Sequence, residues 1–484
     1  MNSRTDKSTR EQGDVAAKRR WRFGVPHIYI ILFSFIALGA LATYLVPGGS
    51  YERIDGPDGR TTIDPESFQF IASQPTTLVD FMLAIPRGMV SAAEVVIFTL
   101  MIGGLFGVLK ATGLVEHAVE ALSKRFSNRG PVLIAVLMGT FSLVATLIGT
   151  QELALVYVPV ILPLIIALKY DSIVAAAIAL CATTAGFTSG ILNPINTGLG
   201  QKLAGVPLWS GFGLRAVIFV VTVTIAIVFV IRYANKVRRD QTLSLMHGSP
   251  AEMEKRRDYT EASRDEPSHK MTKRQRAAAV VALGFFAVLV FGVLKLGWFM
   301  MEMAGLFILV GAIVGVISGL RGAELAEAFN DGFRAVLVGA LIAGIARGVA
   351  VVLEDGQILD TIVYALGEAV GGLPAALAAV GMFVGQMGLN FIIPSGSGQA
   401  LVTMPIMAPL ADILGVTRQT AVLAYQLGDG FGNILFPTSG YFMATLAIAG
   451  VPWQKWVKFF IPLFLIWFVI ALIFLVFAQV TGWS

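Results

Sequence analysis

The chain has 484 residues, of which 56% are hydrophobic and only 14% are charged, and its formal net charge is +5. Its mean hydropathy is +0.76. Soluble proteins carry about 25% charged residues, so this chain has too few to cover a water-exposed surface. A soluble enzyme, a nucleic-acid-binding protein and a disordered scaffold are thereby excluded. The composition predicts an all-α polytopic membrane protein whose surroundings are a lipid bilayer.

The residues that usually bind cofactors are scarce. Cys181 is the single cysteine, and the four histidines are scattered without a metal-ligand spacing. We therefore expect no cofactor and no catalytic residue. A coupling ion, Na⁺ or H⁺, is the one inorganic partner that the sequence leaves open.

The chain begins with a basic tail and continues as a series of apolar segments. Residues 1–25 hold seven Lys/Arg and no cleavage site, which predicts a cytoplasmic tail before an uncleaved span at 26–46. Residues 48–78 indicate an external loop, and 79–93 an interfacial amphipathic segment. Segments apolar enough to cross or enter a bilayer follow. They lie at 94–111, 131–148, 151–168, 172–192, 213–233, 277–295, 298–320, 334–353, 375–393, 399–414, 419–436 and 456–480.

Two pairs of these segments are joined by very short polar stretches, at 149–150 and at 394–398. Such tight joints predict two re-entrant helical hairpins, at 131–168 and 375–412, each returning to the side from which it entered. Two ordinary hairpins that span the bilayer fully are the alternative.

The distribution of charge predicts the orientation. Residues 234–276 contain eleven Lys/Arg and seven acids without apolar periodicity, so we predict a partly disordered cytoplasmic linker loop. Residues 354–373 contain four acids and no Lys/Arg, which places them outside. We expect a multi-pass protein of a bacterial cytoplasmic membrane with its N-terminus in the cytoplasm.

The two halves of the chain repeat each other at an offset of 243–246 residues. Proline and glycine landmarks match, such as Pro194 with Pro437 and Pro159 with Pro405. An odd number of spans separates the copies, so the second is inverted, as in many secondary transporters. The predicted divisions are 26–233 with a broken helix at 171–205, the linker at 234–276, connecting spans at 277–333, and 334–484 with a broken helix at 418–450.

The hairpin tips and the broken helices are the candidate binding site. Free backbone groups at membrane depth are tolerated only where they line a cavity or meet a partner. Free amides suit a carboxylate, whereas free carbonyls with hydroxyls suit Na⁺. The candidate substrate- or ion-binding residues are Gly149, Thr150, Gln151, Glu152, Asn193, Pro194, Asn196, Thr197, Asn390, Ser395, Gly396, Ser397, Gly398, Gln399, Asp429, Asn433, Thr438 and Ser439.

Two carboxylates stand out because ionisable residues inside a membrane are costly. Glu152 is the only charged residue of the first hairpin, and Asp429 precedes the second helix break. A structural role is the alternative for both. Glu94 is a weaker candidate, and Arg347 stays unassigned. Neither the tips nor the breaks contain Lys or Arg, which favours a zwitterionic or cationic solute, or ion coupling through the carboxylates.

The second half also carries a family resemblance. The runs at 394–400, 425–431 and 437–440 resemble the YfcC-like branch of the anaerobic C4-dicarboxylate carrier family, over nearly the whole chain. The resemblance implies an ion-transporter fold, a homodimer, and a transport domain that slides against a scaffold near 94–111, 213–233, 334–353 and 456–480. The family name points to dicarboxylates, whereas this branch is described as amino-acid antiporters.

The function expected from these observations is secondary active transport, by symport or antiport, of a small organic solute. An amino acid and a C4-dicarboxylate both stay open as substrates, and an elevator-type motion is expected. A passive channel for small organic anions is the first alternative, although it predicts a continuous polar stripe. An intramembrane enzyme is the second, although it needs a nucleophile–base or metal constellation that the sequence lacks.

Overall fold

The computed structural model describes residues 28–55, 61–115, 117–118, 125–126, 129–261 and 271–483. The predicted tail at 1–25, and residues 262–270 of the predicted linker, lie outside these ranges. Within them, nine helices are long and apolar enough to cross a membrane. The predicted class, an all-α polytopic membrane protein, is confirmed.

The first half contains the first predicted hairpin and broken helix. Its helices are α1 (Ile28–Leu45), α2 (Leu78–Ser91), α3 (Ala93–Ala111), α5 (Gly130–Ile148), α6 (Ala154–Ala167), α7 (Ser172–Ser189), the π-helical turn η2 (Pro194–Gly198), α8 (Leu199–Leu203) and α9 (Phe212–Arg239).

The second half follows a short connector. Its elements are the 3-10 turn η3 (Gln241–Leu243), α10 (Pro250–Glu261), α11 (Lys273–Leu296), α12 (Met300–Ser318), α13 (Gly322–Asp355), α14 (Leu359–Gly371), α15 (Ala375–Ile392), α16 (Gly396–Ile413), α17 (Arg418–Gly432), α18 (Gly440–Ala449) and α19 (Trp453–Val480).

Short strands form in the predicted external loop at 48–78. β1 (Gly49–Ser50) pairs with β4 (Gln69–Phe70), and β2 (Arg53–Asp55) pairs with β3 (Thr61–Ile63), both antiparallel. Asp360 of α14 anchors this loop, because its carboxylate accepts the Tyr51 amide at 3.0 Å and the Arg53 guanidinium at 3.1 Å.

The helix breaks follow from local backbone chemistry. Gly149 and Gly190 end α5 and α7 at φ +80° and +56°, values that favour glycine. Asp171 caps the start of α7 by accepting the Val174 amide at 3.0 Å. Ser395 caps α16 by accepting the Gly398 amide at 3.4 Å. The two predicted hairpins are therefore the helix pairs α5–α6 and α15–α16.

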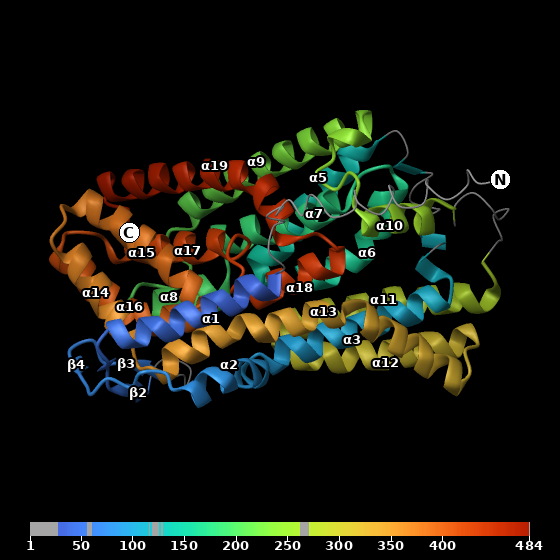
Figure 1. The fold of residues 1–484 in the computed structure, drawn as a ribbon. Helices are drawn as coiled ribbons and strands as arrows, with labels where there is room; N and C mark the ends of the chain where they lie inside the picture. The colour runs from blue at the N-terminus through green and yellow to red at the C-terminus, as the bar shows by residue number, and fades with distance from the viewer. Residues whose placement is uncertain are drawn as a thin grey trace, which may run out of the picture.

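The helices form three layers (Figure 1). Helices α1, α2, α3, α11, α12 and α13 lie along one side, and we call them the α13 unit. The hairpins and broken helices fill the middle, where α7 packs on α5 and α6 while α17 packs on α15 and α16. Helices α9 and α19 lie along the opposite side. The middle layer and these two helices together are called the hairpin unit.

The position of α9 and α19 differs from the scaffold predicted from the resemblance. Helix α9 packs against α5 and α7, and α19 packs against α15 and α17. Aromatic contacts hold α19 in place, since Trp467 stacks on Phe431 of α17 with ring centroids 4.9 Å apart. Both helices therefore belong with the hairpins instead of with α3 and α13.

The two hairpins enter from opposite ends of the molecule (Figure 1). The hairpin of α5 and α6 starts at the end of the molecule that holds α10. The hairpin of α15 and α16 starts at the opposite end, which holds α14 and the strands. Both tips reach the middle. This arrangement agrees with the predicted inversion of the second repeat.

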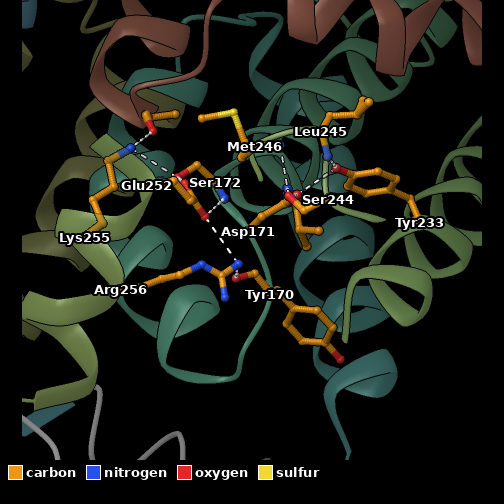
Figure 2. A network of polar contacts seen from close by, with 12 residues as sticks. Tyr170, Asp171, Ser172, Tyr233, Ser244, Leu245, Met246, Glu252, Lys255 and Arg256 are labelled. Atoms are coloured by element: carbon orange, nitrogen blue, oxygen red, sulfur yellow. Dashed lines mark hydrogen bonds and ion pairs between the residues drawn. The ribbon is translucent and has the colours of Figure 1, made fainter. Parts of the chain in front are cut away.

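Part of the predicted linker folds onto the hairpin unit at the α10 end (Figure 2). The fully buried Asp171 carboxylate accepts hydrogen bonds from the Tyr233 hydroxyl at 2.7 Å and from the Ser244 hydroxyl at 2.5 Å. Ser244 lies just beyond η3, so this contact fastens the connector to the start of α7.

Helix α10 continues this network toward the second half (Figure 2). The buried Glu252 accepts the Ser172 amide at 3.1 Å and the Ser172 hydroxyl at 2.5 Å. Lys255 donates to the Ser172 hydroxyl and to the carbonyl of Ala449, the last residue of α18. Burial lowers the pKa of the Lys255 ammonium. The described part of the linker is thus ordered by polar contacts to both halves.

Candidate functional site

Asp429 lies at the centre of a polar cluster in the middle of the hairpin unit. Its side chain is fully buried on α17. One carboxylate oxygen accepts the Asn196 side-chain amide at 2.9 Å, and the other accepts the Asn390 amide at 3.0 Å. Asn196 comes from η2 in the first repeat, and Asn390 from α15 in the second. The same Asn390 amide donates to Asn433 at 3.1 Å.

The tip of the first hairpin joins this cluster through Gln151. The Gln151 amide nitrogen donates to the Gly430 carbonyl at 3.3 Å, and its oxygen accepts the Tyr441 hydroxyl at 2.5 Å. Glu152, the next residue at this tip, accepts the Thr150 hydroxyl. The first tip therefore rests on α17 and α18, the broken helix of the other repeat.

The break after α7 brings further predicted residues beside the tip. Asn193 accepts the Asn196 amide hydrogen at 2.9 Å, which shapes the π-helical turn. Gly149 lies against the Asn193 side chain, because a Cβ at Gly149 would fall 2.3 Å from the Asn193 Oδ1 atom. At the second tip, a Cβ at Gly396 would fall 3.0 Å from an Asp429 oxygen. Both tips thus approach the cluster with glycine backbone.

Several buried polar atoms around the cluster have no hydrogen-bond partner among the described residues. Two of these atoms are the side-chain Oδ1 oxygens of Asn196 and Asn390, the same two residues whose Nδ2 atoms donate to Asp429. Buried groups of this kind are normally paired with protein, water or a ligand. Hydroxyls without a partner on the broken helices are those of Thr188, Thr197, Thr438 and Ser439.

Other predicted residues lie apart from Asp429 or make only local contacts. Gln399 is buried, but its amide donates to Gln386 within the same hairpin at 2.6 Å. Ser395 is exposed and serves as the cap described above, while Ser397 and Gly398 are half-buried in the first turn of α16. Pro194 is exposed at the start of η2.

Glu94 and Arg347 lie outside the hairpin unit. Glu94 is exposed in the first turn of α3. Arg347 of α13 donates to the Ser91 hydroxyl at 3.1 Å and pairs with Glu354 at 3.0 Å. Both residues therefore belong to the α13 unit.

Three residues of this region were missed in the sequence analysis. Tyr441 holds Gln151, as described above. Gln426 of α17 donates to the Thr188 carbonyl at 2.6 Å, at the end of α7. Arg215 of α9 is fully buried and donates to the Gln426 side-chain oxygen. The available signal was the three-residue spacing from Gln426 to Asp429, which puts both on neighbouring positions of one helix.

The cluster presents mainly oxygen atoms to whatever it binds. One buried carboxylate, two amide oxygens and several hydroxyls suit an ammonium group or a dehydrated alkali cation. In the ranges that the structure describes, no three His, Cys, Asp or Glu side chains gather as a metal site. The chemistry supported by this geometry is the reversible binding of a small polar or cationic solute.

The sequence matches the model of the family described as C4-dicarboxylate anaerobic carrier, over residues 25–480. It is 32% identical to the Escherichia coli (strain K12) protein named "Putative basic amino acid antiporter YfcC", with 96% of this chain and 98% of that protein covered. It is 28% identical to an uncharacterized protein of Haemophilus influenzae, with 93% and 96% covered. The Alcanivorax borkumensis YdaH transporter structure gives a TM-score of 0.41 at 16% identity, covering 95% of this chain and 99% of that one.

Proposed function

We propose that this chain, which belongs to the C4-dicarboxylate anaerobic carrier family, is a secondary active transporter whose solute site is centred on Asp429. Family membership makes the chain a membrane transporter and not an enzyme, and it confirms the resemblance noted for residues 394–440. The substrate, the coupling and the motion described below are the proposal.

One observation carries the proposal: amides from both repeats converge on the Asp429 carboxylate. Asn196 and Asn390 stand 233 and 39 residues from Asp429 in the sequence, yet each donates to it. Inverted repeats in secondary transporters place their solute and ion sites where such interrupted helices meet. The remaining predicted site residues are proposed to line the same site or to shape its two tips.

The proposed substrate is an amino acid that carries a cationic group, with a C4-dicarboxylate as the second candidate. The buried Asp429 favours a positive group in the site, and so does Glu152, which follows the residue that bonds the Gly430 carbonyl beside Asp429. The name of the Escherichia coli relative, an antiporter of basic amino acids, supports this choice. The name of the family supports the dicarboxylate.

The coupling and the motion complete the proposal. Unpartnered carbonyl oxygens and hydroxyls beside Asp429 support a Na⁺ site, and the carboxylates themselves support H⁺ coupling or exchange. The hairpin unit is proposed to move as an elevator against the α13 unit, in a homodimer whose N-terminus lies in the cytoplasm. The repeat boundaries predicted from the sequence, 26–233 and 334–484, are kept as part of this proposal.

Solute exchange in proteoliposomes tests the proposal. Vesicles loaded with unlabelled arginine should accumulate labelled arginine, and vesicles loaded with succinate test the dicarboxylate in the same way. We expect Asp429→Asn to abolish exchange in folded protein. Asp331→Asn, a matched change at an exposed site on α13, should leave it intact. Exchange that persists in Asp429→Asn overturns the site. If labelled solute enters empty vesicles as fast as vesicles loaded with unlabelled solute, the result supports the passive channel instead.

A further inference from the structure

Arg215 is buried beside the proposed site and has no acidic partner among the residues that the structure describes. Arg215 is 0% exposed, and it is the one fully buried basic side chain among the residues that the structure describes. Its Nη1 atom donates to Gln426, and its guanidinium lies 5.5 Å from the centre of the Trp483 ring. Its Nε and Nη2 atoms have no hydrogen-bond partner in the described chain.

An arginine in this condition is expected to have an anionic partner. Removing an unpaired charge from water costs several kcal/mol, so buried charges are normally paired. A neutral amide and an aromatic face compensate this cost only in part. The planar guanidinium fork matches a carboxylate, which accepts two parallel N–H groups. The two free nitrogen atoms of Arg215 are therefore suited to a carboxylate that the ligand supplies.

The surroundings of Arg215 connect it to the Asp429 cluster. Gln426, which accepts its hydrogen bond, lies one helical turn before Asp429 on α17, and such residues are neighbours on a helix surface. Gly190 at the α7 break lies against both Gln426 and Thr197, since a Cβ there would meet each of them within 2.1 Å. The Thr197 hydroxyl is also buried and unpartnered.

We propose that Arg215, together with the Thr197 hydroxyl, binds the carboxylate of the transported solute while Asp429 binds its cationic group. This assignment rests on the proposed function and deepens it. A positive and a negative side chain on one side of α17 select a solute that carries both charges. Gln426 is the positioning residue, because it holds the guanidinium beside the break in α7.

A pair of solutes that differ only in the carboxylate tests the assignment. Arginine and agmatine share the guanidinium and the amine, but agmatine lacks the carboxylate. We expect wild-type protein in proteoliposomes to show a KM for arginine at least about tenfold below that for agmatine, which is the worth of one charge-assisted hydrogen bond. In Arg215→Met, the KM for arginine should rise to that for agmatine, while the KM for agmatine stays unchanged.

The controls separate binding from structure. Arg215→Lys keeps the charge without the fork, so it should retain part of the preference for arginine, and it serves if Arg215→Met fails to fold. An equal rise of both KM values in folded variants assigns Arg215 a structural role and overturns the inference alone. Wild-type protein that exchanges neither compound overturns the proposed amino-acid function, and this assignment with it.

Discussion

Replacing Gly186 with alanine tests how closely a hairpin and its broken helix must approach. Gly186 of α7 packs on α5, and a Cβ there would lie 2.1 Å from the Ser142 carbonyl oxygen. Non-bonded atoms prefer about 3.5 Å, so the two helices would have to separate by about 1.4 Å at this contact. Overpacking of this kind costs about 1–3 kcal/mol, and we expect Gly186→Ala to fall at the upper end.

The second repeat offers the same test at Gly428, where α17 packs on α15. A Cβ there would lie 2.8 Å from the Phe383 carbonyl oxygen, a milder conflict than at Gly186. Gly428→Ala should therefore destabilise the protein less than Gly186→Ala does. Both glycines sit where the helix after a hairpin crosses the first helix of that hairpin, which is α7 on α5 in the first half and α17 on α15 in the second.

The assay is thermal unfolding of the purified chain in detergent, at one heating rate, followed by tryptophan fluorescence. Gly139→Ala in α5 and Gly388→Ala in α15 are the controls, because a Cβ at either position meets nothing within 4 Å. Alanine stabilises a helix by about 0.5–1 kcal/mol relative to glycine, so the melting temperatures of these two variants should stay the same or rise. If Gly186→Ala melts together with Gly139→Ala, the close approach of α5 and α7 is refuted.

Two further predictions concern side chains whose hydrogen bonds join segments distant in the sequence. Asp171→Ala removes a helix cap and leaves the Tyr233 hydroxyl without its acceptor, so it should destabilise the fold by about 2–4 kcal/mol in the same thermal assay. Asp240→Ala, at an exposed cap whose carboxylate accepts the Thr242 amide and hydroxyl two residues away, should change the melting midpoint far less. Tyr441→Phe removes the hydrogen bond to Gln151. Because such a bond contributes about 1–2 kcal/mol to the free energy of binding, the KM for exchange should rise about tenfold. An unchanged KM would show that the first tip is held without Tyr441.

The interruptions of the helices could be predicted from the sequence because they depend on local chemistry. Gly149 and Gly190 adopt left-handed conformations that side chains disfavour, and Ser395 and Asp171 cap the helices that follow. Such signals act over a few residues, so the positions of the helix breaks can be read from the sequence. The match between the halves predicts that the second half contains the same elements in the same order.

The partners of the polar residues could not be predicted, because they depend on packing between distant segments. Asn196 meets Asp429 across 233 residues, and no local pattern encodes that contact. Arg215 stands near the start of a span, where a cation usually anchors the helix at the interface, and only the packing of α9 buries it. Helix α10 is strongly polar, so its sequence predicts a solvated segment, yet Glu252 is buried against α7.

The network around α10 makes the two ends of the molecule different. A protein built from two inverted copies would, if the copies were identical, have equal free energies when open to either side of the membrane. The contacts from Glu252 and Lys255 lie at one end, and the strands with Asp360 occupy the other. For the transport cycle proposed above, these unequal ends set which face the empty carrier presents at rest, and a charge change within α10 would alter that resting population.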